Sequence, residues 1–423
     1  MNLSACALPA RCDVLVVGAG PAGSAAAQWL ARAGVDVVLI DRSAFPRDKV
    51  CGDGLIPDAH RALRRLGVLD EVLRVACPAT HVAAIGPRGG RIEVPGELAV
   101  LPRSKLDLIV CQAAVAAGAR MFAPLRYVGP LLQPASPDST ATARVVGARL
   151  QGAGVEREIR ADWTILASGA MPQALQAAGL CERRTPSAVA LRGYVHNPSM
   201  STRITALEVA WHPRLRTGYG WIFPCGDGLF NIGVGVEHSH RSAAGASMSE
   251  IDLRDMLRQF GQTHPIAGEL MAGGRWVGAL KGAPLRCSLA GAGLSRPGLL
   301  VAGEAAGSTF AFTGEGIGKA LETGMLAAQA LIDAEPQAHD PEQADRLLRA
   351  GYEERVRALQ PLFDVYDRAN VVNRHPWLVD LLIWSARRSP ARLQKMAGVL
   401  AETYMPTNLL TMGSMMRLLF ERG

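Results

Sequence analysis

The first forty residues constrain the fold of this chain more than any other segment. An apolar run over residues 12–17 leads into a glycine-rich turn, Gly18-Ala-Gly-Pro-Ala-Gly23. An alanine-rich segment of helical character follows, and a second apolar run over residues 35–40 ends at Asp41. This succession of strand, turn, helix and strand with a terminal acid is typical of a βαβ unit that binds an ADP-containing dinucleotide.

Each residue of the turn has a physical task in such a unit. Gly18 permits the tight turn, Gly20 lets the backbone approach a pyrophosphate, and Gly23 lets the helix pack closely on the strands. Pro21 and Ala22 open the helix, whose unpaired N–H groups and positive dipole end attract phosphate. These five residues are therefore predicted to bind the cofactor.

The second strand ends in a further pair of predicted cofactor residues. Asp41 follows Gly23 by 18 residues, which is close to the spacing at which a carboxylate grips ribose hydroxyls. Arg42 is the next residue along the chain. The alternative to this interpretation is a glycine turn in an unrelated α/β fold.

Composition narrows the class of protein. The 423 residues are 49% hydrophobic and 20% charged, which predicts a globular chain of two or three lobes. No stretch reaches the roughly 18 uncharged apolar residues of a membrane span, and no signal peptide is recognised, so a cytoplasmic location is expected. The eight cysteines form no CxxC pair or Cys/His cluster, so no metal site is predicted. No nucleic-acid-binding motif is found.

The net charge of +7 is partly concentrated at the C-terminus, where the last fifty residues carry seven Lys or Arg against three acids. An Arg-rich solvated surface explains this balance, and so does contact with an anionic membrane or a carrier protein. A peripheral position on the inner membrane face is thus a candidate location. Nearby apolar residues at helical spacing suit either core or dimer packing or a membrane contact: Leu409, Met412, Met416 and Leu419.

The remaining pattern predicts an α/β protein, α+β overall. A helix is expected over residues 56–75, and a run of short strands over 188–236 predicts a separate antiparallel sheet. We therefore expect a Rossmann-like domain in three parts, an inserted substrate domain and a C-terminal helical region. The expected segments are 1–80, 101–187 and 286–335 for the first domain, 81–100 and 188–285 for the second, and 336–423 for the helices.

A second glycine-rich segment lies late in the chain. An apolar run ends at Gly303-Glu304, and Gly314-Glu-Gly316-Ile317 opens a long helical segment. With the N-terminal turn, this segment resembles the two halves of the FAD site in the para-hydroxybenzoate-hydroxylase-like superfamily. The resemblance implies that FAD is the dinucleotide. It also implies that Gly303, Glu304, Gly314, Gly316 and Ile317 bind it, with glutamate standing where the family has aspartate.

Two further segments bear on this resemblance. Pro102-Arg103-Ser-Lys-Leu-Asp107 resembles a family segment in which the arginine lies against the sugar-phosphate side of the flavin. The alternative for Arg103 is a solvated residue at a helix start. Ser168-Gly169 stands where the family carries Asp-Gly, a motif that often contacts flavin and reduced nicotinamide. This departure leaves the electron donor open, with NADPH, ferredoxin and reduced flavin as the candidates.

The substrate side resembles a narrower group. Phe45-Pro-Arg-Asp-Lys49-Val-Cys51-Gly52-Asp-Gly54 and Gly218-Tyr-Gly-Trp-Ile-Phe-Pro224 are similar to the loop and the aromatic strand of the geranylgeranyl reductase family. The resemblance implies that Cys51 and Gly52 lie over the flavin, with Cys51 and Lys49 as candidate catalytic residues. At strand spacing, Tyr219, Trp221 and Phe223 share one face and are predicted to bind a hydrophobic substrate.

The predicted function is reduction of carbon–carbon double bonds in an isoprenoid, lipid or polyketide-like molecule by hydride transfer from flavin N5. Three alternatives stay open: a flavin hydroxylase, a halogenase, and a flavoprotein that only carries electrons. Halogenases of this superfamily carry Gly-Glu-Ser where this chain has Gly52-Asp53-Gly54, which favours the reductase. The alternative for the aromatic strand is that it belongs to a sheet that only covers the core. The alternative for Cys51 is that it is a packing residue.

Overall fold

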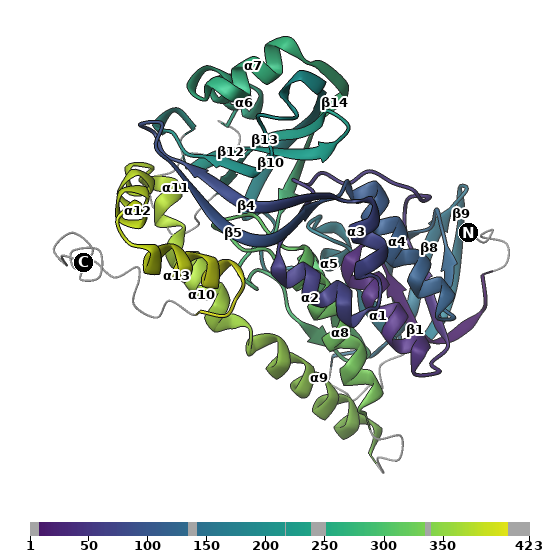
Figure 1. Cartoon of the computed structure of the whole chain (residues 1–423). Helices are drawn as coiled ribbons and strands as arrows, with labels where there is room; N and C mark the ends of the chain where they lie inside the picture. The colour runs from purple at the N-terminus through teal and green to yellow at the C-terminus, as the bar shows by residue number, and fades with distance from the viewer. Residues whose placement is uncertain (1–7, 134–141, 216, 238–250, 335–339, 405–423) are drawn as a thin grey trace.

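The computed structural model describes residues 8–133, 142–215, 217–237, 251–334 and 340–404. Two β-sheets lie side by side, each with helices packed against it, and a set of C-terminal helices lies at the end of the molecule away from the N-terminus (Figure 1). The predicted fold class is confirmed: a Rossmann-like α/β unit, an inserted sheet of largely antiparallel strands and a helical C-terminal region.

The first sheet contains the N-terminal βαβ unit. Its central strands run in parallel in the order β16-β9-β1-β2-β6, and antiparallel strands extend it from β16 and β9. The strands are β1 (Arg11–Val17), β2 (Val37–Ile40), β6 (Arg120–Phe122), β7 (Arg126–Leu132), β8 (Val145–Gly152), β9 (Val155–Leu166), β15 (Ser295–Arg296) and β16 (Leu299–Val301).

Both faces of this sheet are covered, which explains why its strands are nearly continuous apolar runs. In β1, Val14 and Val16 face a core built with helices, whereas Leu15 and Val17 face a second core built with β8 and α5. Alternate side chains of one strand thus serve two cores. The helices of this half are α1 (Pro21–Arg32), α4 (Arg103–Ala116), α5 (Gln173–Ala177), α8 (Ile317–Ile332) and α9 (Pro341–Arg357).

The second sheet has the order β14-β10-β13-β12-β11-β4-β5-β3. Its pairs are antiparallel except that β11 runs parallel to β4. These two strands are far apart in sequence, so no hairpin turn dictates their relative direction. The strands are β3 (Gly54–Leu55), β4 (Cys77–Ile85), β5 (Arg91–Val100), β10 (Ala188–His196), β11 (Leu207–Ala210), β12 (Gly218–Gly226), β13 (Leu229–Glu237) and β14 (Arg275–Leu285).

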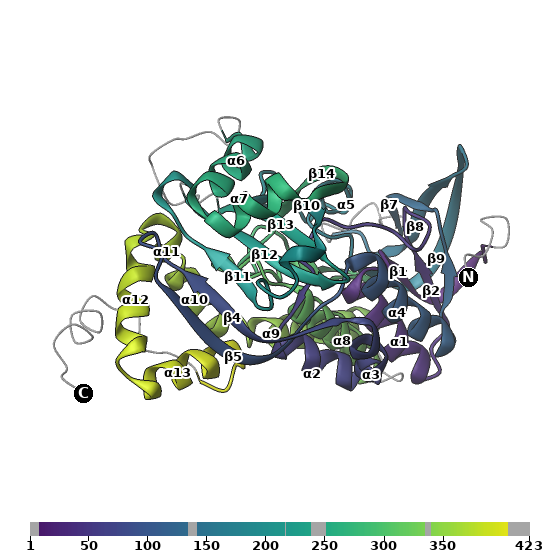
Figure 2. The ribbon, with the colours of Figure 1, turned by 45° about the horizontal axis from the view of Figure 1, so that its top comes forward.

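Helices cover this sheet from two sides, as the turned view in Figure 2 shows. On one face, α6 (Leu253–Thr263) and α7 (Pro265–Gly273) pack on the central strands through Phe260 and its neighbours. On the other face, the C-terminal helices approach β4, β5 and β11. They are α10 (Gln360–Ala369), α11 (Val371–Arg374), α12 (Trp377–Arg387) and α13 (Pro390–Leu400).

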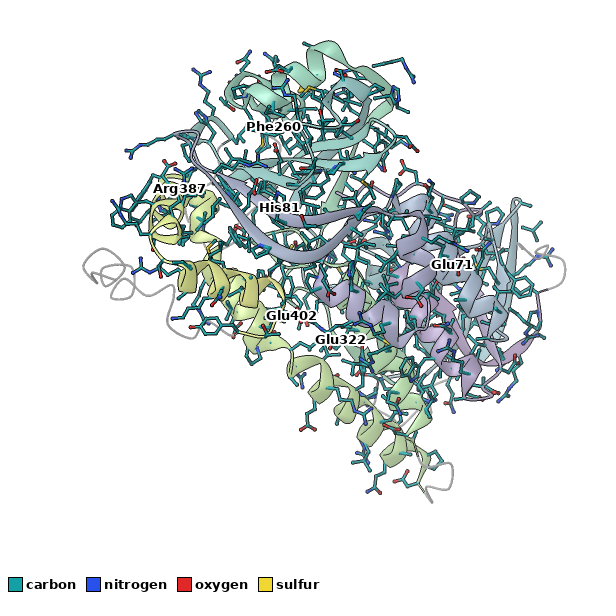
Figure 3. The ribbon with its side chains drawn as sticks, viewed as in Figure 1. Glu71, His81, Phe260, Glu322, Arg387 and Glu402 are labelled. Carbon is teal, nitrogen blue, oxygen red and sulfur yellow. The ribbon has the colours of Figure 1, made fainter. Side chains whose placement is uncertain are left out.

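The C-terminal helices are tied back to the first half by charge. The buried Lys319 of α8 donates to Glu322, 2.7 Å away, and to Glu402, 3.1 Å away; both glutamates are labelled in Figure 3. The predicted apolar stripe Leu409, Met412, Met416 and Leu419 lies outside the described residues. The division of the chain into the six expected segments stays a proposal.

The predicted helix over residues 56–75 is divided into two. The helices are α2 (Pro57–Arg65) and α3 (Leu69–Val75), and Gly67 between them has a φ of +71°. A left-handed residue of this kind ends a helix, and glycine adopts it without the cost of a Cβ. The apolar side chains on either side of the break are buried against α8.

The crossing of α1 and α8 provides a test of close packing. A Cβ added to Gly324 would lie 2.1 Å from the carbonyl oxygen of Ala22. We expect Gly324→Ala to destabilise the protein by about 1–3 kcal/mol, because overpacking outweighs the roughly 1 kcal/mol that alanine contributes to helix propensity. Urea unfolding at fixed FAD excess measures the difference.

Gly351 of α9 is the matched control. A Cβ there would meet nothing within 4 Å. Gly351→Ala is therefore expected to stabilise the protein by about 0.5–1 kcal/mol. Equal effects of the two substitutions would contradict the close helix crossing.

Candidate active site

One cavity of about 810 Å³ joins the two halves of the molecule. It runs from the glycine turn of α1, past the loop that contains Cys51, to the inner faces of the C-terminal helices. All of the sequence-predicted site residues line it except Gly23 and Gly303. The lining members are Gly18, Gly20, Pro21, Ala22, Asp41, Arg42, Lys49, Cys51, Gly52, Arg103, Tyr219, Trp221, Phe223, Glu304, Gly314, Gly316 and Ile317.

The glycine turn at the start of α1 forms a cradle that is open only because its glycines lack side chains. Gly18 has a φ of +101°, and a Cβ there would lie 2.3 Å from the carbonyl oxygen of Ala167. Gly23 does not line the cavity, because it packs against the Gly18 carbonyl, where a Cβ would approach to 1.7 Å. No side chain caps α1, so its first N–H groups are directed at the cavity and suit a pyrophosphate.

Asp41 is fixed for the ribose role that the sequence predicts. Its carboxylate accepts hydrogen bonds from the N–H groups of Ala19, at 3.0 Å, and Ser43, at 2.9 Å. The side chain is buried at the end of β2, within the cavity wall. Arg42 beside it is exposed at the cavity rim.

Two arginines converge on the same turn. Arg103 makes a bidentate contact with the buried Asp107, at 2.6 and 2.9 Å, and Arg47 reaches Asp107 at 3.1 Å and Asp41 at 3.3 Å. A Cβ on Gly20 would lie 3.3 Å from the Arg47 guanidinium. Burial disfavours the charge on Arg103, but Asp107 outweighs this effect and raises its pKa. The two cations thus suit the phosphates of FAD.

Arg47 and Asp107 are site residues that the sequence analysis did not single out. Both occur in segments that it quoted, the Phe45–Gly54 loop and the Arg103–Asp107 helix start. The i,i+4 spacing of Arg103 and Asp107 is a local signal for their ion pair. The contact of Arg47 with both Asp41 and Asp107 has no local signal, because it joins separate segments.

The late glycine segment closes the cradle from the other side. Gly303 has a φ of +67° and opens a 3₁₀ turn over Gly303–Ala306, so its backbone packs against Ala22 rather than lining the cavity. Glu304 lines the cavity and is 3.3 Å from the Lys49 ammonium. Ser168 presents a buried hydroxyl that has no hydrogen-bond partner among the described residues, which suits a polar atom of FAD.

The start of α8 completes the candidate flavin site. Gly314 and Gly316 surround Glu315, and no side chain caps the helix that begins at Ile317. A Cβ on Gly314 would lie 2.8 Å from the Tyr219 hydroxyl. The uncapped N–H groups and the dipole of α8 suit the negative charge of a reduced flavin. Together with the α1 cradle, these residues fit FAD.

Glu315 is an unusual carboxyl in this wall. Burial raises its pKa to about 8, repulsion from Asp58 adds to the shift, and a hydrogen bond from Thr313 opposes it. Burial likewise raises the pKa of Asp58 to about 7, although Lys319 opposes the shift. Glu315 therefore retains a proton at neutral pH.

Asp53, two residues after Cys51, anchors the loop that contains both residues. Asp53 is fully buried and accepts hydrogen bonds from the Tyr194 hydroxyl at 2.5 Å, the Asn231 amide at 2.7 Å and the Arg103 N–H at 3.2 Å. Asn231 also donates to the Cys51 carbonyl at 2.8 Å. Burial raises the pKa of Asp53 to about 6, against these hydrogen bonds.

Tyr194 and Asn231 are site residues that were not predicted from the sequence. Asn231 is a polar residue of β13 that stands between the buried apolar residues Phe230 and Ile232. A buried amide needs hydrogen-bond partners, so this position is the one signal for the network. Its oxygen accepts from the Trp221 indole at 2.9 Å, so the network also orients the aromatic strand.

Aromatic rings form the wall beyond Cys51. Tyr219, Trp221 and Phe223 all line the cavity, and the Tyr219 and Trp221 ring centroids are 6.2 Å apart. Trp211 and Phe312 extend the wall, with centroids 5.9 Å apart. Farther on, the lining is aliphatic and comes mainly from the C-terminal helices: Val372, Val379, Leu382, Ile383, Met396, Val399 and Leu400. This end of the cavity suits a long apolar chain.

Among the described residues, no group of three or more His, Cys, Asp or Glu side chains is arranged to hold a metal ion. In the same part of the chain, no helix is long and apolar enough to cross a membrane.

Known proteins match this chain over most of its length. A family model described as an FAD binding domain matches residues 11–212. A menaquinone reductase of Mycolicibacterium smegmatis is 35% identical over 75% of this chain and 76% of its own. A digeranylgeranylglycerophospholipid reductase of Methanopyrus kandleri is 30% identical over 76% of this chain and 80% of its own.

The fold has solved counterparts. The crystal structure of a geranylgeranyl bacteriochlorophyll reductase-like protein from Thermoplasma acidophilum superposes with a TM-score of 0.68, at 22% identity, over 97% of this chain and 96% of the other. Flavin-dependent halogenases share the fold as well. The fold is therefore that of FAD-dependent oxidoreductases with several chemistries.

The raised pKa of Glu315 predicts a pH-dependent stability. A carboxyl whose pKa is higher in the folded than in the unfolded state loses stability as pH rises from the unfolded value toward the folded one. Between pH 5 and 8 we expect the free energy of unfolding of the wild-type protein to fall by up to about 1.4 kcal/mol per pH unit relative to that of Glu315→Gln. Urea unfolding at matched FAD excess and several pH values measures this difference, and parallel pH profiles would contradict it.

Proposed function

This chain belongs to the geranylgeranyl reductase family of FAD-dependent oxidoreductases, and from that membership we propose that it reduces a carbon–carbon double bond in a hydrophobic isoprenoid-bearing substrate. The observation that carries the proposal is the continuity of one cavity. The FAD cradle at α1 opens past Cys51 into a compartment walled by aromatic and aliphatic side chains.

The proposed reaction adds one hydride and one proton across an alkene. FAD, when bound and reduced, supplies the hydride from its N5 atom. The aromatic wall of Tyr219, Trp221 and Phe223 orients the apolar chain, and the cavity excludes water from it. Because the alkene is bound next to the flavin, the reaction avoids much of the entropy cost of a bimolecular reduction.

Cys51 is the proposed proton donor. Burial raises the pKa of its thiol, although Arg103 opposes the shift, so the group keeps its proton at neutral pH. Lys49 is proposed to assist by holding the loop through its ion pair with Glu304. The carboxyl of Glu315 lies in the same cavity wall and is a second protonated group.

Two alternatives keep the cofactor and change the chemistry. A hydroxylase or a halogenase would use the same FAD cradle, and halogenases share the fold. The loop sequence Cys51-Gly52-Asp53-Gly54 and the apolar length of the cavity favour reduction of a lipid-like chain. A carrier of electrons alone has no use for such a compartment.

Donor and location belong to the proposal as well. We propose NADPH as the electron donor. We also propose a cytoplasmic location with contact to the inner membrane face or to a carrier protein, which suits an apolar substrate. The basic balance of the C-terminal region supports this location.

The proposed reaction predicts substrate-dependent reoxidation. The FAD-loaded protein is reduced with a stoichiometric amount of dithionite without oxygen and mixed with detergent-dispersed geranylgeraniol. Flavin absorbance should return, and mass spectrometry should find a product heavier by two hydrogens. The fully saturated alcohol is the matched control and should leave the flavin reduced. Reoxidation only with oxygen and a phenol, or only with oxygen and bromide, would replace the reductase by a hydroxylase or a halogenase.

The role of Cys51 predicts a selective loss. Cys51→Ala should slow alkene reduction by about 100-fold or more, the usual contribution of a general acid, while the bound FAD and its spectrum persist. Cys77→Ala is the control, because this half-buried thiol of β4 does not line the cavity. Turnover of Cys51→Ala equal to that of the control would refute the proton-donor role.

A further inference from the structure

The helix α12 is apolar on two opposite faces. Its inner face is buried, and Val379, Leu382 and Ile383 line the cavity. Its outer face carries Trp377, which is 57% exposed, and Trp384, which is 41% exposed. A helix that is apolar on both sides needs a second apolar environment beyond the protein core.

The outer residues form one stripe along α12. Trp377, Leu381, Trp384 and Arg388 follow at steps of four, three and four residues, which places them on one helix face. The Arg388 guanidinium lies 3.8 Å from the Trp384 ring centroid. Indole rings beside cations are typical of side chains at the interface of a bilayer with water.

Positive charge predominates in the segment that contains the stripe. Between residues 374 and 395 there are five Lys or Arg side chains and one carboxylate, a net charge of +4. The carboxylate, Asp380, is mostly covered and accepts a hydrogen bond from the Arg88 N–H. The cations are Arg374, Arg387, Arg388, Arg392 and Lys395, of which Arg374 lies 3.9 Å from the carboxylate of Glu237.

The stripe lies at the end of the molecule opposite the parallel sheet. Figures 1 and 2 both place α12 and α13 at this end, and Arg387 is labelled there in Figure 3. The aliphatic end of the cavity lies directly behind these two helices, since Ile383 of α12 and Met396 of α13 belong to its lining.

We propose that the outer faces of α12 and α13 dock on the surface of an anionic phospholipid bilayer. The two tryptophans insert at the headgroup level, and the cations pair with lipid phosphates. Docking then brings the apolar end of the cavity against the lipid, from which a chain-bearing substrate enters. The docking specifies the surface for the membrane contact proposed above, and the substrate's entry rests on the proposed reaction, which the docking itself does not require.

The excess of positive charge favours a membrane over a protein partner. A protein interface fixes its register with charges of both signs and with satisfied hydrogen bonds at its rim. The stripe offers cations around two indoles and one covered carboxylate. A bilayer with anionic headgroups needs no register, so this pattern matches it.

Vesicle flotation tests the docking. The FAD-loaded full-length protein is mixed with vesicles of phosphatidylcholine alone or with about one third phosphatidylglycerol. We expect binding to the anionic vesicles, and its loss in 0.5 M salt, where the Debye length falls to roughly 4 Å. Arg388→Glu with Lys395→Glu should reduce binding at least about tenfold, since each cation contributes about fivefold.

Matched substitutions on α9 control for a general effect. Leu347 is 65% exposed, and Arg346 is exposed beside it, on a helix far from α12. Leu347→Ser with Arg346→Glu should leave vesicle binding unchanged. An equal loss in this control and in the α12–α13 variant would overturn the proposed surface.

A second measurement locates the tryptophans. Vesicles with brominated acyl chains should quench the fluorescence of the wild-type protein, and Trp377→Phe with Trp384→Phe should lose most of the quenching while keeping FAD. Unchanged quenching in that variant would refute insertion of the stripe. A shift from dimer to monomer in gel filtration of the same variant, without vesicle binding by the wild type, would assign the stripe to a second copy instead.

The two proposals can fail separately. Reduction of detergent-dispersed substrate without vesicle binding overturns the docking alone. Vesicle binding without flavin reoxidation by any isoprenoid substrate overturns the proposed reaction and leaves the docking in place.

Discussion

The loop over residues 41–54 is the constraint on which the rest of the site depends. It leaves the parallel sheet at Asp41 and enters the second sheet at Gly54, so it must cross between them. Polar contacts hold each part of it: Arg47 to Asp107, Lys49 to Glu304, Asp48 to Arg192 and Lys281, and Asp53 to Tyr194 and Asn231. Because most of these partners belong to other segments, the loop fixes how the FAD cradle and the aromatic wall face each other.

Local and non-local features differed in how well the sequence predicted them. The glycine turn, the strand at residues 12–17 and the aromatic strand were predictable, because strict spacing within a few residues produces them. The partners of Asp53 were not, since Tyr194 and Asn231 come from strands whose register is set by the whole sheet. Burial alone distinguished Asn231 from a surface amide, and burial is not visible in a single sequence.

The existence of the C-terminal helices could be predicted from the sequence, but their role in the cavity could not. A helical region was predicted over residues 336–423, and the described part of it contains the helices α9 to α13. Their role in closing the cavity depends on packing against β4, β5 and β11, which the pattern does not encode. The two apolar faces of α12 are indistinguishable in sequence; only the position of the sheet makes Ile383 an inner residue and Trp384 an outer one.

Desolvation links the cradle, the loop and the apolar compartment. It raises the pKa of Cys51, in the loop over residues 41–54, and of Glu315, just before α8, and both residues line the same cavity. An apolar substrate requires a dry compartment, and a dry compartment keeps acidic groups protonated. The same physical condition that admits an isoprenoid chain therefore supplies protons where an alkene reduction consumes one. A hydrophilic substrate would bring water to these groups and lower their pKa values. The apolar cavity and the protonated acids therefore have one common cause, the exclusion of water.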